Sequence, residues 1–88
     1  GGSLAFGLAV RSVGERGKRS VRRLVADARR GDEAALERLG GHAVDSLTKV
    51  IAAGDTVTAT CTVDGEHAVL FCYLDRKTMQ VARAVVCR

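Results

Sequence analysis

The sequence predicts an α+β fold in which N-terminal helices pack on a bent antiparallel β-meander. Two observations carry this prediction. The first half of the chain places apolar residues at helical spacing among many arginines, and the second half alternates apolar with polar residues and is rich in β-branched side chains. Helices followed by a run of strands are typical of the α+β class. With 88 residues, the chain is expected to form a single domain spanning residues 1–88.

The helical part is expected over residues 18–53. Residues 18–30 read as the main amphipathic helix, because their apolar side chains fall on one arc and their arginines on the other. Gly31 then ends this helix, and Asp32 caps a short second one. Residues 42–53 also show apolar positions at helical spacing, so we expect a further short helix there.

Residues 1–17 are expected to form an N-terminal arm. Within it, the run Leu4–Val10 fits either an additional strand or the start of a long helix, and the sequence leaves both open. The run is too short to span a membrane, which takes about 20 apolar residues. A membrane anchor upstream of Leu4 is not excluded.

Three strands are expected over residues 56–87. Thr56–Val63 and Glu66–Leu74 flank Asp64-Gly65, a dipeptide typical of two-residue hairpin turns, and Met79–Cys87 supplies the third strand. A meander of this kind supplies an apolar face for the helices to cover.

The hairpin turn fixes the register of the first two strands. It places Val63 opposite Glu66 and Val57 opposite Cys72. We further expect Leu74 to pair with Met79 across the next turn. The face that packs on the helices then consists of Val57, Ala59, Cys61, Val63, Ala68, Leu70, Cys72, Leu74, Met79, Val81 and Val85, with Arg83 as an interruption.

The opposite face of the predicted sheet is too apolar for plain solvent surface. A core this small and poor in aromatic residues gains from association, so we expect this face to join a second copy or a protein partner. The expected interface residues are Val69, Phe71, Tyr73, Ala84 and Val86.

Charge is unevenly distributed along the chain. Residues 1–30 carry eight Lys/Arg against two acids, whereas residues 31–88 carry six against eight. A basic helix face is most often simply solvated, but it also fits a nucleic acid or another anionic surface. The candidate anion-binding residues are Arg19, Arg22, Arg23, Arg29 and Arg30.

The three cysteines and two histidines show no metal-ligand spacing, so we expect no metal and no cofactor. The predicted register also keeps Cys61, Cys72 and Cys87 too far apart for a disulfide, whose Cα atoms lie within about 7 Å. Free thiols in turn favour a reducing, cytoplasmic setting.

The run VRRLVADARRGDEAALERLGGHAV, residues 21–44, resembles the opening of small NTF2-like (SnoaL-like or cystatin-like) domains, and Gly54-Asp55-Thr56-Val57 resembles their next strand. The resemblance implies a bent antiparallel sheet wrapped around a helix. This chain is shorter than a typical member and lacks the usual aromatic lining of a ligand cone. The segment GDTVTATCTV is also similar to hot-dog domains, which are the alternative architecture.

Enzymatic members of that superfamily use Asp, His, Tyr or Arg side chains inside the cone, which makes His42, Asp45, His67, Tyr73 and Arg83 the candidates here. His67 and Tyr73 share one predicted face and line either a shallow pocket or an interface. Because no general base with an orienting partner can be named, we lean against an enzyme. The favoured function is a non-catalytic dimerisation or partner-binding domain. The alternatives are nucleic-acid or polyanion binding through the basic helix and a small-ligand-binding or enzymatic domain.

Overall fold

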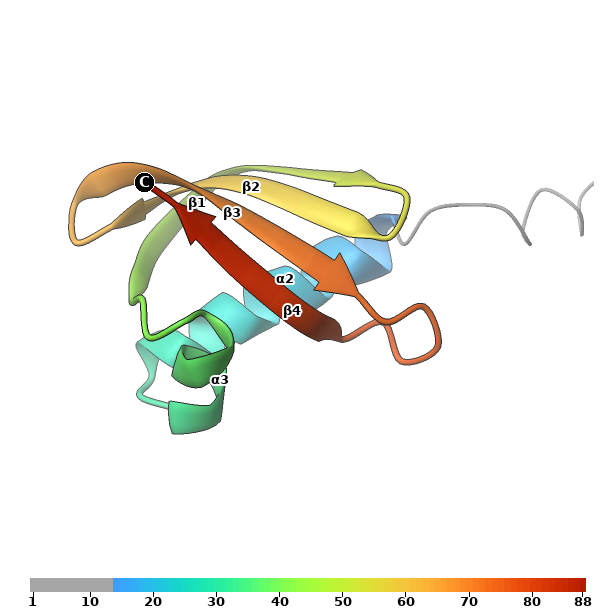
Figure 1. Cartoon of the computed structure of the whole chain (residues 1–88), viewed down its shortest axis with the longest axis horizontal. Coiled ribbons are helices and arrows are strands. Elements are labelled where there is room, and N and C mark those ends of the chain that lie inside the picture. Colours follow the sequence, from blue (N-terminus) through green and yellow to red (C-terminus); the bar gives the residue numbers. More distant parts are fainter. Residues whose placement is uncertain (1–13) are drawn as a thin grey trace, which may run out of the picture.

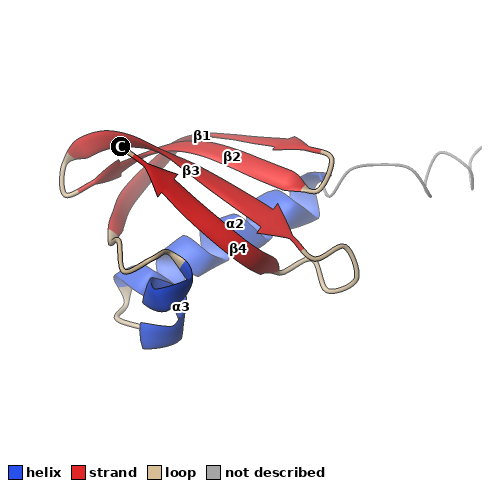
Figure 2. Cartoon of the chain, viewed as in Figure 1, coloured by secondary structure: helices blue, strands red, loops and turns tan. Residues whose placement is uncertain are grey.

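The computed structural model describes residues 14–88. Its elements are α2 (Gly14–Arg29), α3 (Glu33–Arg38), β1 (Val44–Ala53), β2 (Thr56–Val63), β3 (Glu66–Leu74) and β4 (Val81–Cys87). The four strands form one antiparallel sheet in the order β1-β2-β3-β4. Helix α2 crosses one face of this sheet, and α3 packs on α2 (Figure 1; Figure 2). The predicted α+β class is confirmed. The two alternatives for Leu4–Val10 lie outside the described residues.

Helix α2 begins at Gly14 rather than at residue 18, so the last part of the expected arm is helical. At its other end, Gly31 adopts a left-handed φ of 91°. The amide of Gly31 donates to the carbonyl of Ala28, and that of Asp32 donates to the carbonyl of Asp27. This pair of bonds satisfies carbonyls that the helix end would otherwise leave free.

Helix α3 begins at Glu33 and is capped by the preceding residue, Asp32. The Asp32 carboxylate accepts hydrogen bonds from the amides of Ala34 and Ala35, at 3.0 and 3.3 Å, which satisfies two of the free donors of the first turn. The capped helix buries Ala35, and Leu39 follows it into the core.

The helix expected over residues 42–53 is wrong, because this segment is strand β1 and the sheet therefore has four strands, not three. The register between β1 and β2 shifts twice, after Val44 and after Leu47. Each shift adds one residue to the two-residue repeat of a strand. As a result Val44, Leu47 and Val50 face α2 at intervals of three residues, a spacing that imitates one side of a helix.

The β2–β3 hairpin has the register that the sequence predicted. Val63 pairs with Glu66 and Val57 with Cys72, with no shift between them. The turn residues Asp64 and Gly65 have φ angles of 53° and 80°, the left-handed conformations that a tight hairpin turn requires.

The expected register of the last strand is wrong. Leu74 pairs with Val81 instead of Met79, and a register shift next to Tyr73 leaves Ala82 as an extra residue. Met79 lies in the preceding loop with a φ of 59°.

One extra residue in a strand moves all later side chains to the opposite face. Ala84 and Val86 therefore pack against the core, although both were expected on the exposed face. Val85 pairs with Phe71 on the exposed face, although it was expected in the core, and Arg83 lies on that exposed face too.

The core lies between α2, α3 and the face of the sheet that α2 crosses, which we call the inner face. All of its buried side chains are apolar. They are Val21, Val25, Ala28, Ala35, Leu39, Val44, Val57, Ala59, Cys61, Val63, Ala68, Leu70, Cys72, Leu74 and Val81. Neither α2 nor α3 is long and apolar enough to cross a membrane.

Candidate functional site

The outer face of the sheet, which is the side turned away from α2, carries a row of residues that crosses all four strands. Ile51 pairs with Thr58, Thr58 with Phe71, and Phe71 with Val85. The Ile51 side chain is 50% exposed. Phe71 and Val85 are half-buried. The middle of this face therefore presents an uncharged strip to solvent, which is apolar except for Thr58.

Further residues extend the strip on both sides. Val69 pairs with Cys87, and Tyr73 pairs with Arg83, whose guanidinium carbon lies 5.5 Å from the centre of the Tyr73 ring. Lys49 and Arg83 are charged residues whose strand pairing places them on this face, and each belongs to an edge strand. Apolar and aromatic residues of β3 and threonines of β2 thus fill the centre, and charge lies at the rim.

Three of the five expected interface residues lie on this face: Val69, Phe71 and Tyr73. Ala84 and Val86 do not, because the extra residue in β4 turns them toward the core. Ile51 was not predicted as an interface residue, because a helix was expected over residues 42–53.

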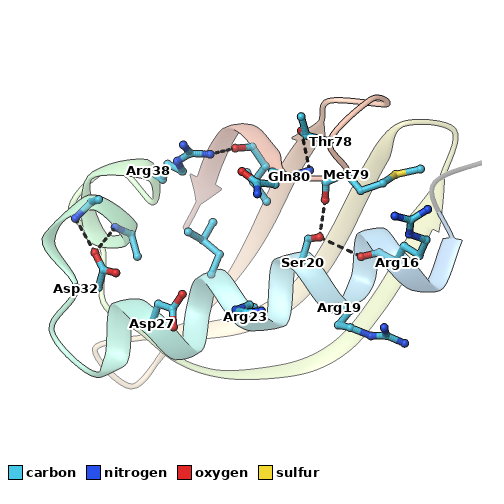
Figure 3. Close-up of a pocket in the computed structure, with 14 residues that line it drawn as sticks. Arg16, Arg19, Ser20, Arg23, Asp27, Asp32, Arg38, Thr78, Met79 and Gln80 are labelled. Carbon is cyan, nitrogen blue, oxygen red and sulfur yellow. Dashed lines mark hydrogen bonds between the residues drawn. The ribbon is translucent and has the colours of Figure 1, made fainter.

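A second surface is a cavity of about 600 Å³ between α2, α3 and the loop that leads into β4, which we call the arginine groove (Figure 3). Its walls combine polar and charged side chains with a partly apolar floor. The lining residues are Arg16, Arg19, Ser20, Arg23, Leu24, Asp27, Asp32, Ala34, Ala35, Arg38, Thr78, Met79, Gln80 and Val81.

Hydrogen bonds hold the walls of the groove together. The Ser20 hydroxyl on α2 lies within hydrogen-bond reach of two carbonyl oxygens, that of Met79 and, at 3.1 Å, that of Arg16. The Arg38 guanidinium on α3 donates to the carbonyl of Val81 at the start of β4 (Figure 3). Helix α2 is thereby tied to the loop before β4, and α3 to the first residue of β4.

The two acids of the groove already have partners. Asp27 forms an ion pair with Arg30, and Asp32 caps α3. The three arginines on the α2 wall are Arg16, Arg19 and Arg23. Each is exposed, and within residues 14–88 no carboxylate forms an ion pair with them. The groove therefore has a net positive charge on its α2 wall.

The five candidate anion-binding residues do not all lie on one surface. Arg19 and Arg23 line the groove, whereas Arg22, Arg29 and Arg30 do not. Arg16 was missed because the helix was expected to begin at residue 18, although its spacing from Arg19 and Arg23 is helical. Arg38 has no comparable sequence signal, because only the fold brings α3 to this wall.

The residues considered for catalysis do not form a common site. His67 and Tyr73 are exposed on the outer face, opposite Thr62 and Thr56, and neither lines the arginine groove. The Asp45 carboxylate accepts a hydrogen bond from the amide of Gly65 at 2.9 Å, so it joins β1 to the hairpin turn.

His42 is half-buried in the connection between α3 and β1. Arg83 is brought to Tyr73, where the two side chains stack. Within residues 14–88, no three His, Cys, Asp or Glu side chains are grouped so that they could hold a metal ion.

All three cysteines are free thiols, as the sequence predicted. Burial raises the pKa of the Cys72 thiol to about 12, and a charge on Cys61 adds to the increase. Burial also raises the pKa of Cys61. Both thiols stay protonated at neutral pH and are weak nucleophiles. Cys87 is exposed on the outer face.

The chain matches no family model, no curated protein and no solved structure. The candidate functional surfaces of the described chain are the outer face and the arginine groove.

Proposed function

We propose that this chain is a non-catalytic association domain that forms a homodimer through the outer face of its sheet. The observation that carries the proposal is the strip Ile51, Thr58, Phe71 and Val85, which crosses the sheet in one line with no charge in it. Removing such a strip from water is favourable by about 25 cal/mol per Å² of apolar surface.

The distribution of polarity supports a protein interface. Specific interfaces have an apolar, uncharged centre rich in aromatic residues and a polar rim. Phe71 lies in the centre, and Lys49 and Arg83 lie on the edge strands, where they stay in contact with water when the centre is covered. Two copies can therefore meet without burying a charge.

The size of the face indicates how strongly two copies associate. Four strands about 4.8 Å apart, over about six residues at 3.4 Å each, describe a face of roughly 400 Å². Two such faces together give roughly 800 Å², which is below the about 1,200 to 2,000 Å² that stable specific interfaces bury and is the size of a weak, transient contact. We expect a dimer that dissociates on dilution to low micromolar concentration.

Two further assignments belong to this proposal. An NTF2-like fold is supported by a helix that crosses one face of an antiparallel sheet. A cytoplasmic setting is supported by the three free thiols, because reducing compartments keep cysteines in that form.

Sedimentation velocity over a range from micromolar to near-millimolar concentration tests the dimer. Ile51→Lys places a charge in the apolar strip and should shift the protein to monomer without unfolding it, since Ile51 is half exposed on an edge strand. Phe71→Asp should do the same in the centre of the strip. Ala26→Asp, on the exposed side of α2, adds a charge away from the face and serves as the control.

A wild-type protein that stays monomeric at the highest concentration would overturn the proposal. So would a dimer that tolerates Ile51→Lys as well as Ala26→Asp, because the association would then use another surface. Circular dichroism melts of each variant separate loss of the dimer from loss of the fold.

A further inference from the structure

Helix α2 carries two pairs of arginines with the same spacing and different surroundings. Arg16 and Arg23 are seven residues apart and line the arginine groove. Arg22 and Arg29 are also seven residues apart and also exposed, but they lie on the other flank of the helix and outside the groove. Only the first pair faces a second wall, made by α3 and residues 78–81 (Figure 3).

The positive charge of this wall is not cancelled from within the described chain. Asp27 is paired with Arg30, and the Asp32 carboxylate is occupied by two α3 amides. Arg38 donates to the carbonyl of Val81 and is held in place. Arg16, Arg19 and Arg23 form a row of residues along α2, and within residues 14–88 they form no ion pair.

The length of this row matches a run of phosphates. Seven residues of α-helix rise about 10 Å, which is the axial span from Arg16 to Arg23. One strand of B-form DNA presents a phosphate about every 3.4 Å along its axis, so roughly three phosphates occupy the same span. Three arginines thus lie within the span of about three phosphates, and the planar fork of a guanidinium group suits a phosphate.

The described walls of the groove offer no aromatic ring on which a base could stack. The Phe and Tyr residues of positions 14–88, Phe71 and Tyr73, are not in this lining and lie on the outer face of the sheet. Proteins that hold single strands stack bases on aromatic rings, whereas contacts to phosphates alone suit a duplex and are independent of its sequence.

We propose that the arginine groove binds the phosphodiester backbone of duplex nucleic acid, independently of sequence, through Arg16, Arg19 and Arg23. Arg38 and Ser20 are positioning residues, which fix the facing wall through their bonds to Val81 and Met79. This activity uses a different surface from the dimer and does not depend on it.

Fluorescence anisotropy of a labelled, mixed-sequence DNA duplex, measured with the 88-residue chain at several salt concentrations, tests the proposal. Contact with three phosphates should give a plot of log affinity against log salt with a slope of about −2.7. Arg16→Gln/Arg23→Gln should weaken binding about tenfold at low salt and bring the slope to about −0.9. A single strand of the same sequence should bind more weakly than the duplex.

Arg22→Gln/Arg29→Gln is the matched control, because it removes the same charge at the same spacing from the same helix. It should change the affinity less than about threefold and leave the slope unaltered. Equal losses in the two double variants would overturn the proposal, since binding would then follow net charge alone. So would tighter binding of the single strand, displacement of the duplex by an equal charge of polyglutamate, or no binding at low salt.

Discussion

The inner and outer faces of the sheet are built from the same four strands, yet they are covered very differently. On the inner face, Val57, Leu70 and Cys72 are fully buried under the helices. On the outer face, Ile51 is 50% and Tyr73 41% exposed. Because side chains alternate along a strand, neighbouring residues belong to opposite faces. The inner face therefore governs folding stability, and the outer face is free to serve association.

The largest expected effect comes from the same substitution made on the two faces. Val57→Ala opens a space in the fully buried core and should lower the free energy of unfolding by about 2 to 3 kcal/mol. Val69→Ala, on the half-buried outer face of β3, should cost less than about 1 kcal/mol. Urea unfolding of both variants gives the two values.

Repeating the unfolding measurements at several protein concentrations separates Val57→Ala from Val69→Ala further. If the outer face joins two copies, the cost of Val69→Ala should grow as the wild-type dimer becomes populated, because association adds to the wild-type stability. The cost of Val57→Ala should not depend on concentration in this way. Equal costs for the two variants at low concentration would contradict the difference between the faces.

The central and the edge strands differ in how well the sequence predicts them. The β2–β3 hairpin follows a two-residue repeat around the turn Asp64-Gly65, and its register was predicted correctly. Strands β1 and β4 contain three register shifts between them. In β1 these shifts produce helix-like spacing, and in β4 a single shift exchanges the two faces. A bulge depends on pairing between strands and leaves no local mark in the sequence.

The binding surfaces follow the same rule. Val69, Phe71 and Tyr73 lie in the regular hairpin and were correctly placed on one face. Only part of the groove could be predicted from the sequence. Arg19 and Arg23 share a helix, whereas Arg38 and Met79 reach the groove through tertiary contacts. Local periodicity predicts what lies along one element, whereas a wall built from three elements requires the fold.

The buried thiol of Cys72 predicts an alkaline loss of stability of intermediate size. Its pKa is raised to about 12 in the folded chain, from 9.0, so between these values the unfolded chain loses a proton that the folded chain keeps. The contribution of Cys72 to the free energy of unfolding is therefore fully present below about pH 9. Above that pH it is lost by up to about 1.4 kcal/mol per pH unit. Cys72→Ala should remove this part of the slope in urea unfolding at pH values from about 8 to about 11.

Cys87→Ala is the control for that titration, because Cys87 is exposed on the outer face. Its removal should leave the slope unchanged. An unaltered alkaline slope in Cys72→Ala would mean that the folded chain admits water or charge to the inner face, against the contrast between the two faces.

The smallest expected effect is the stacking of Arg83 on Tyr73 at the rim of the outer face. At 5.5 Å from the ring centre, an exposed cation–π contact contributes about 0.5 to 1 kcal/mol. Arg83→Gln should lower the free energy of unfolding by about that amount, and Arg83→Lys, which keeps the cation, by less. Arg76→Gln, which removes the same charge from the exposed loop before β4, corrects for the change in net charge. If urea unfolding gives the same loss of unfolding free energy for Arg83→Gln and Arg76→Gln, the contact between Arg83 and Tyr73 contributes nothing to stability. The Tyr73 ring would then be held in the outer face by its own strand alone.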